Sequence, residues 1–252
     1  MIDSIKIEKS LRKILPTMQK PGRYVGGEYN QIKKDWSAVK THVALVFPDI
    51  YDIGLPNLGL MILYETINNR TDALAERAYV PWLDMEKAMR ENDLPLYSLE
   101  SKIPLSQFDL IGFTIPYESL YTNVLNALNV AGIPLRSAER GNESPIIIAG
   151  GHATYNPEPM ASFIDAFVIG EGEEVIHEII DALQHSSAPE ATREETLAVL
   201  ARIPGVYVPS FYQPIYHDDR TIASVSPTRA DFPAQVTKRL CAQLPPPPTH
   251  FL

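Results

Sequence analysis

The sequence is almost without cysteine. Cys241 is the single cysteine among 252 residues, so the chain forms no internal disulfide. Sites in which cysteine alone binds a metal or an iron–sulfur cluster need several thiolates. This chain therefore cannot build such a site by itself.

Long hydrophobic runs are missing as well. The longest, residues 43–48 and 145–149, have the length of strands, whereas a membrane-spanning helix takes about 20 apolar residues. The N-terminus, MIDSIKIEKSLRKIL, is charged throughout and lacks the apolar centre of a signal peptide. We therefore expect no membrane partner and a cytoplasmic location.

The chain has no excess of positive charge. It carries 22 Lys and Arg against 31 Asp and Glu, a net charge of −9. That balance argues against general nucleic-acid binding, although a local basic patch stays possible. With 45% hydrophobic and 21% charged residues the composition is that of an ordinary globular protein.

Several catalytic motifs are absent from the sequence. There is no G-x-x-x-x-G-K-[ST] phosphate loop, no G-x-G-x-x-G after the first predicted strand, no H-E-x-x-H or Cys/His zinc spacing, and no G-x-S-x-G elbow. We therefore assign no catalytic residue and no metal site to this chain.

Apolar runs of strand length alternate with helical patterns. The predicted strands are 43–47, 78–80, 109–115, 145–149 and 165–169, and the helices that follow are 60–69, 82–92, 120–131 and 174–184. This alternation predicts an α/β fold, a flavodoxin-like (Rossmann-like), doubly wound sheet of five mainly parallel strands. Ligands of such sheets bind beyond the carboxyl ends of the strands.

Other segments flank the predicted α/β domain at 41–185. Residues 1–40 are predicted to form a helix at 2–19 and an irregular arm. Residues 186–230 are predicted to add a short helix at 195–201 and a β-hairpin at the edge of the sheet. Residues 231–252, with four consecutive prolines at 245–248, are predicted to be a linker.

The loops at the strand ends hold the candidate binding residues. The first loop has the spacing D-x-Y-x-x-G, the third follows a threonine, the fourth begins with Gly-Gly and the fifth reads GEGE. These candidates are Asp49, Tyr51, Gly54, Thr114, Glu118, Gly150, Gly151, His152, Gly170, Glu171 and Glu173.

Three stretches together resemble one known family over most of residues 10–210. They are KPGRYVGGEYN, GFTIPYESLYTNVLNALNVAGIPL and IIIAGGHATYNPEPMASFIDAFVIGEGEEVIHEII. In this order they resemble the N-terminal, cobalamin-binding-type domain of radical S-adenosylmethionine (radical SAM) proteins, in a poorly characterised subfamily.

The resemblance implies cobalamin at the carboxyl ends of the strands. In cobalamin-binding domains D-x-H-x-x-G provides a histidine as the lower cobalt ligand, and here Tyr51 takes its place. Thr114 stands where their motif has serine. Their Gly-Gly lets the nucleotide tail of the cofactor approach the backbone.

In that family a radical SAM barrel follows, with C-x-x-x-C-x-x-C holding a four-iron cluster that binds S-adenosylmethionine. This sequence lacks that motif. The resemblance therefore implies an N-terminal piece of a longer enzyme whose partner is its own barrel. We expect no turnover of S-adenosylmethionine by this chain alone, and the substrate is not readable from it.

Alternative interpretations stay open at this stage. A domain that has lost cobalamin and serves in substrate recognition or docking fits the tyrosine at position 51, and a response-regulator-like or nucleotide-binding flavodoxin fold ranks lower. Gly150 and Gly151 either approach a ligand or form a tight strand exit, and His152 either faces a bound group or is hydrogen-bonded in its loop. Glu171 and Glu173 either accept hydrogen bonds from a ligand or cap the next helix. The arm at 23–27 either folds over the cleft or docks on the barrel.

Overall fold

The computed structural model describes residues 4–186, 191–242 and 244. Its centre is a six-stranded sheet with the order β2-β1-β3-β4-β5-β6. The first five of these strands are parallel and β6 is antiparallel to β5. The order 2-1-3-4-5 is that of flavodoxin-like sheets, which confirms the predicted fold class and adds a sixth strand. The strands are β1 Thr41–Phe47, β2 Ala73–Tyr79, β3 Leu110–Thr114, β4 Ile146–Gly150, β5 Ala166–Val168 and β6 Val206–Tyr207.

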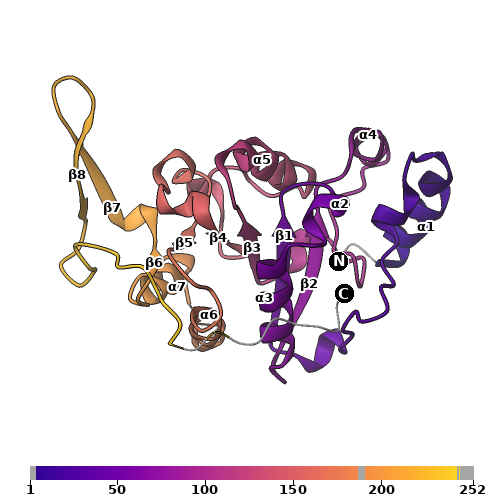
Figure 1. Ribbon diagram of the computed structural model, residues 1–252, viewed down its shortest axis with the longest axis horizontal. Helices are drawn as coiled ribbons and strands as arrows, with labels where there is room; N and C mark the ends of the chain where they lie inside the picture. The colour runs from indigo at the N-terminus through magenta and orange to yellow at the C-terminus, as the bar shows by residue number, and fades with distance from the viewer. Residues whose placement is uncertain (1–3, 187–190, 243, 245–252) are drawn as a thin grey trace.

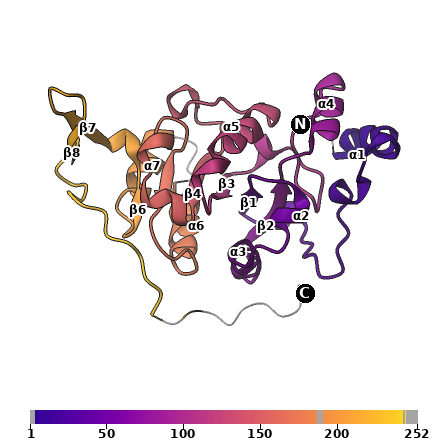
Figure 2. The ribbon, with the colours of Figure 1, turned by 45° about the horizontal axis from the view of Figure 1, so that its top comes forward.

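Helices cover both faces of the sheet. Figures 1 and 2 show α3 and α6 on one face and α4 and α5 on the other. Each helix buries an apolar stripe, as amphipathic helices on a sheet do. The helices are α1 Ser4–Ile14, α2 Tyr51–Gly54, α3 Leu58–Asn68, α4 Leu83–Glu91, α5 Tyr121–Val130, α6 Val175–His185 and α7 Arg193–Leu200.

Strand β2 starts earlier than the sequence predicts. The prediction began it at residue 78, whereas the structure begins it at Ala73. The prediction was wrong because Glu76 and Arg77 interrupt the apolar pattern, and yet both are buried, with 1% and 2% of their surface exposed. Arg77 Nε donates to Glu100 Oε1 at 2.7 Å, and Glu100 is itself fully buried. A paired and hydrogen-bonded charge is tolerated inside a strand where a single one is not.

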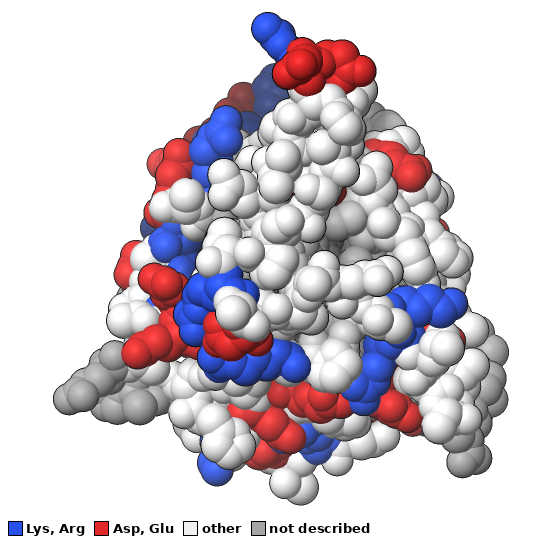
Figure 3. Space-filling model, turned by 90° about the vertical axis from the view of Figure 1, so that its left-hand side faces the viewer, with Lys and Arg blue, Asp and Glu red and all other residues white. Residues whose placement is uncertain are grey.

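The predicted hairpin forms, but it is not part of the sheet edge. Strands β7 (Tyr212–Tyr216) and β8 (Ile222–Pro227) pair with each other in a separate two-stranded sheet. The short strand β6 takes the edge position instead. The hairpin projects from the molecule in Figure 1, and Figure 3 shows this side with a charged tip above a broad uncharged area whose margins mix both charge signs.

The N-terminal segment packs on the outer side of β2. The predicted helix at 2–19 is shorter: α1 ends at Ile14 and a 3₁₀ turn, Leu15–Thr17, follows. Leu11 and Ile14 are buried on its inner face. No helix in the described part of the chain is long and apolar enough to cross a membrane.

Candidate functional site

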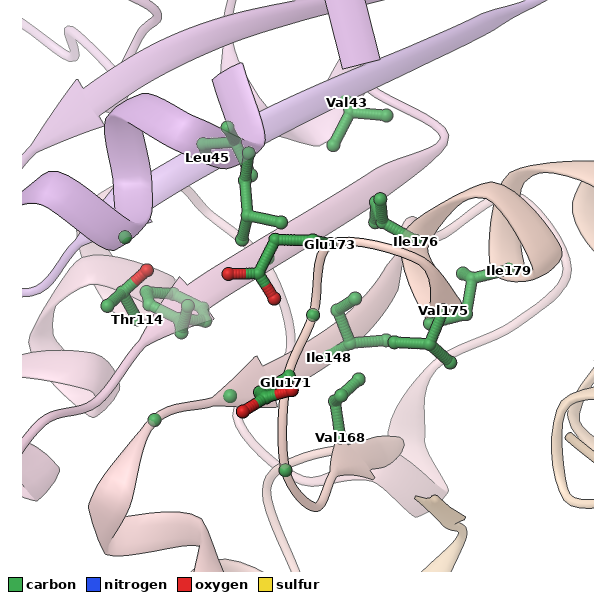
Figure 4. Close-up of a pocket in the computed structure, with 18 residues that line it drawn as sticks. Val43, Leu45, Thr114, Ile148, Val168, Glu171, Glu173, Val175, Ile176 and Ile179 are labelled. Atoms are coloured by element: carbon green, nitrogen blue, oxygen red, sulfur yellow. The ribbon is translucent and has the colours of Figure 1, made fainter. Parts of the chain in front are cut away.

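An apolar pocket lies at the carboxyl ends of the strands, between α3 and α6 and above the sheet. Its volume is about 260 Å³. Figure 4 shows side chains from β1, β4 and β5 and from the start of α6 converging on it. The loop at 170–174, which joins β5 to α6, forms one wall. The place agrees with the rule that ligands of open α/β sheets bind beyond the strand ends.

The floor of the pocket is a row of three residues on adjacent strands. Gly112 on β3 is in register with Leu45 on β1 and with Ile148 on β4. The two flanking side chains are apolar and the residue between them has none. The floor is therefore hollow at its centre.

Three glycines in this pocket are not explained by backbone strain or by crowding. A Cβ on Gly150 would have only the Cβ of Val168 nearby, at 4.0 Å, and one on Gly59 only the side chain of Asn57, at 3.5 Å. A Cβ on Gly112 would lie 3.4 Å from Leu45, at the limit of ordinary contact. None of the three has a positive φ. What these glycines preserve is open space inside the pocket.

Two further glycines are required by the backbone. Gly151 has φ +110°, and a Cβ there would lie 2.6 Å from the carbonyl oxygen of Ile115. Gly170 has φ +113°, and a Cβ there would collide with the backbone of Arg239. Side chains rarely adopt this conformation, so glycine is needed at both positions. The two members of the Gly-Gly pair thus differ: Gly150 leaves room and Gly151 makes the strand exit.

Three polar side chains reach the pocket. Thr114 ends β3, and Glu171 and Glu173 stand on the wall at 170–174. In Figure 4 both carboxylates project from that wall on the side where Thr114 lies. Both carboxylates contact Cys241: Glu171 accepts from its backbone N–H, and Glu173 Oε2 lies 3.7 Å from its Sγ. Their oxygens face the pocket and the C-terminal segment.

The D-x-Y-x-x-G loop does not contribute to this pocket. Asp49 Oδ1 accepts from the backbone N–H of Ile50, its immediate neighbour. Gly54 packs so tightly that a Cβ there would lie 2.6 Å from the ring of Tyr79. The structure therefore separates Asp49, Tyr51 and Gly54 from the glycines after β4 and β5.

Tyr51 is turned toward the N-terminal arm. Its hydroxyl donates to Glu28 Oε1 at 3.1 Å, and its ring meets that of Tyr79 edge-on at 5.3 Å between centroids. Burial, reinforced by the Glu28 carboxylate, raises the pKa of Tyr51 to about 12. Glu28 also pairs with the buried Arg77 at 3.3 Å. Tyr51 is thus a neutral hydrogen-bond donor in a buried network and not a free ligand.

The next residue of the loop also holds the arm. Asp52 accepts from Lys20 at 3.0 Å and from Arg23. The hydrogen bond from Arg23 leads the causes that lower the pKa of Asp52 to about 2. In this structure the arm docks on the first loop and on β2.

Two other candidates lie outside the pocket lining. Glu118 and His152 are both exposed, each just after a strand end. The His152 ring makes no hydrogen bond within the described part of the chain. Among the described residues, no group of three or more His, Cys, Asp or Glu is arranged to hold a metal ion.

Sequence reasoning missed most of the pocket wall. The missed residues come from the strands, from the loop before α6 and from two helices, and they are Val43, Leu45, Gly59, Leu63, Gly112, Phe113, Ile148, Val168, Gly172, Val175, Ile176 and Ile179. Gly112 was the available signal, because a glycine inside an apolar strand marks a bulge or a close approach. The others are ordinary core residue types, which carry no such mark.

Comparison with protein families gives one match. The model of the family described as "Radical SAM proteins, N-terminal" matches residues 59–209. The match includes α3 and α6 and the loops after β3, β4 and β5. The arm, the first loop and the C-terminal segment lie outside it.

Two solved structures resemble the chain at 13% identity and a TM-score of 0.41. Both are of OxsB, a cobalamin-dependent S-adenosylmethionine radical enzyme, one with aqua-cobalamin bound and one with aqua-cobalamin and S-adenosylmethionine. The alignments cover 84% and 90% of this chain but only 27% and 29% of the OxsB chains. No curated protein matches the sequence.

Proposed function

We propose, from the premise that this chain belongs to the family of radical SAM proteins as their N-terminal domain, that it is a cobalamin-binding module. In the full protein it holds cobalamin at the carboxyl ends of its strands for a radical SAM barrel that follows it. Cobalamin bound there supplies a cobalt centre for methyl transfer or radical chemistry. The iron–sulfur cluster and S-adenosylmethionine belong to the barrel, and the substrate is set there too.

The observation that carries this proposal is the hollow, apolar pocket between α3 and α6. The nucleotide tail of cobalamin ends in a flat aromatic base, which needs an apolar slot and close backbone approach. Gly59, Gly112 and Gly150 keep such a slot open where neither φ nor packing demands glycine. The residues present therefore fit the tail of the cofactor.

The polar rim fits the rest of the cofactor. Cobalamin carries neutral amide side chains and a ribose, which donate hydrogen bonds. Glu171 and Glu173 accept such bonds, and the hydroxyl of Thr114 accepts or donates. These three side chains orient the bound group, while the apolar lining excludes water from its base.

The first loop would offer no side chain to a bound cobalt. Tyr51 is held by Glu28 and lies outside the pocket lining. With the base of the cofactor in the pocket, the bound form is base-off. We accordingly expect the spectrum of base-off cobalamin, without a protein nitrogen or phenolate on the cobalt.

A titration with hydroxocobalamin, followed by visible absorption and calorimetry, tests the proposal. We expect saturable micromolar binding and a base-off spectrum. Substitution Gly150→Leu fills the pocket and is expected to weaken binding at least about tenfold, which is 1.4 kcal/mol. Gly22→Leu is the matched control, since Gly22 has no neighbour within 4 Å and lies in the arm.

The control experiment also separates the two candidate functions. If neither wild type nor the Gly22→Leu variant binds hydroxocobalamin, in isolation and in the full protein, cobalamin binding is overturned. The alternative is then a module that kept the fold and serves in docking or substrate recognition. The engagement of Tyr51 with Glu28 is the observation that favours this alternative.

A further inference from the structure

We propose that residues 236–241 form a strap that positions the pocket wall at 170–174, with Arg239 as the positioning residue. This inference deepens the proposed function, because its consequence for cofactor retention rests on it. The strap lies outside the segment matched by the family, residues 59–209. Nothing in the family match therefore assigns it a role.

The strap is joined to the end of β5 by backbone hydrogen bonds. The Arg239 N–H donates to the carbonyl of Ile169 at 2.8 Å, and the Glu171 N–H donates to the carbonyl of Arg239 at 3.1 Å. Gly170 and Arg239 form a parallel bridge. The strap thus prolongs the pairing of the sheet beyond β5, at the point where the chain turns into the pocket wall.

Two glycines make room for this contact. A Cβ on Gly170 would collide with the Arg239 backbone, and a Cβ on Gly205 would lie 2.8 Å from the Arg239 Cβ. Both glycines have positive φ, +113° and +87°. The chain at Gly170 and the chain at Gly205 therefore both leave room for Arg239 of the strap.

The strap contacts four carboxylates in and after the pocket wall. The Arg239 guanidinium pairs with Glu178 at 2.5 Å and with Glu174 at 3.4 Å. The Cys241 N–H donates to the carboxylate of Glu171, and the Cys241 Sγ lies 3.7 Å from Glu173 Oε2. Figures 1 and 2 show this segment passing along α6.

The strap acts on the pocket through these contacts. Glu171 and Glu173 line the pocket, whereas Arg239 and Cys241 do not. The carboxylates of the wall lie close in sequence to Glu174 and Glu178, and such neighbouring charges repel one another. The Arg239 guanidinium reduces this repulsion because it pairs with Glu174 and Glu178. Without Arg239 the wall at 170–174 is expected to open more often and to release a bound ligand faster.

A charge reversal and its compensation test the proposal. We compare Arg239→Glu with the double variant Arg239→Glu/Glu178→Arg, which restores the pair with opposite polarity. Arg202→Glu is the control, because Arg202 forms an exposed pair with Asp231, outside the pocket lining. Unfolding midpoints are measured for all four proteins, so that a loss of stability alone is recognised.

Two measurements are made on each variant. Amide hydrogen exchange at residues 169–173 is read without cofactor, and the dissociation rate of hydroxocobalamin is read with it. For Arg239→Glu we expect both rates to rise about tenfold, which corresponds to 1.4 kcal/mol. In the double variant both rates should return toward the wild-type values. In Arg202→Glu both rates should equal those of wild type.

The outcomes are distinct. If hydrogen exchange at residues 169–173 is unchanged in Arg239→Glu, the proposal that the strap positions the wall is overturned. If exchange is faster but the dissociation rate of hydroxocobalamin is unchanged, the role of the strap in cofactor retention is overturned. A wild type that protects residues 169–173 but does not bind hydroxocobalamin overturns the proposed function instead. In that case the hydrogen exchange of Arg239→Glu and of the double variant alone decides whether the strap positions the wall.

Discussion

The carboxyl edge of the sheet has two parts of opposite character. Beyond β1 and β2, tyrosine, carboxylate and guanidinium groups of the first loop and the arm satisfy one another in a tightly packed network. Beyond β3, β4 and β5, the strand ends surround an apolar pocket whose floor is hollow at Gly112. The motif that resembles a cofactor signature lies in the first part, whereas the space for a ligand lies in the second. The spacing of the motif alone therefore did not identify the residues that surround the pocket.

The largest loss of stability is expected when the buried ion pair between Arg77 and Glu100 is broken. Arg77→Met leaves the fully buried Glu100 without its partner, which costs about 3–5 kcal/mol. Urea unfolding measures the loss. The control Lys87→Met removes an exposed pair with Glu91 and should cost no more than about 1 kcal/mol. Equal losses in both variants would contradict the buried role of Arg77.

A pair of glycine substitutions sharpens the difference in packing. The Cβ of Gly54→Ala would lie 2.6 Å from the ring of Tyr79 and 2.8 Å from the Cβ of Phe47, and such overpacking typically costs about 1–3 kcal/mol. The matched change Gly150→Ala has its nearest neighbour at 4.0 Å, and we expect it to lie within about 0.5 kcal/mol of wild type. Thermal unfolding of the two variants compares them. A costly Gly150→Ala would show that the pocket is already filled by packing.

Tyr51→Phe tests whether the first loop takes part in binding. The variant loses the hydrogen bond to Glu28, and we expect about 0.5–1.5 kcal/mol less stability. The affinity for hydroxocobalamin should stay within about twofold of wild type, well under the 1.4 kcal/mol of a tenfold change. A tenfold weaker titration would place the first loop in the cofactor site after all.

The smallest expected effect is a pH dependence of the arm. The pKa of Asp52 is about 2 in the folded chain against an ordinary 3.8. A lowered carboxyl pKa stabilises the folded state above about pH 4, and this contribution is lost as the pH falls through 2. The stability gap between wild type and Asp52→Asn should thus be below about 1 kcal/mol at pH 5, since the pair is partly exposed.

The unfolding midpoints of wild type and Asp52→Asn, measured between pH 5 and pH 3, show whether the stability gap narrows or widens. The gap should narrow as the pH falls. A gap that widens toward acid would mean that Asp52 is not held ionised by Arg23 and Lys20.

Strand β2 and the hairpin mark where sequence reasoning failed on the fold. The pattern of alternating strands and helices predicted the sheet, because each strand but β2 is a nearly continuous apolar run. The first half of β2 was missed because Arg77 looked like a surface residue. Its partner Glu100 lies 23 residues away in the chain, so the sequence did not show the pair. The hairpin at 212–227 was predicted as a hairpin, but no local pattern says whether it joins the central sheet or stays separate.

The pocket shows the same limit. Six of the candidates were predicted from their place at or after strand ends, and the structure brings them to one pocket: Thr114, Gly150, Gly151, Gly170, Glu171 and Glu173. Helical periodicity identified α6 but not which of its residues face a ligand. That Gly112 lies between Leu45 and Ile148 depends on strand register, which is set by packing across the sheet.

The sequence by itself determined the class of fold and the edge of the sheet where a ligand is expected, because apolar periodicity and strand-end glycines are local properties. Three of its stretches also resembled the family that the family model matches. Only the tertiary structure decided that Tyr51 belongs to the arm, that Gly150 leaves space while Gly151 turns the chain, and that Arg239 reaches the pocket wall. Those roles depend on contacts between residues far apart in the sequence, such as Tyr51 with Glu28 and Arg239 with Ile169, and such contacts exist only once the chain has folded.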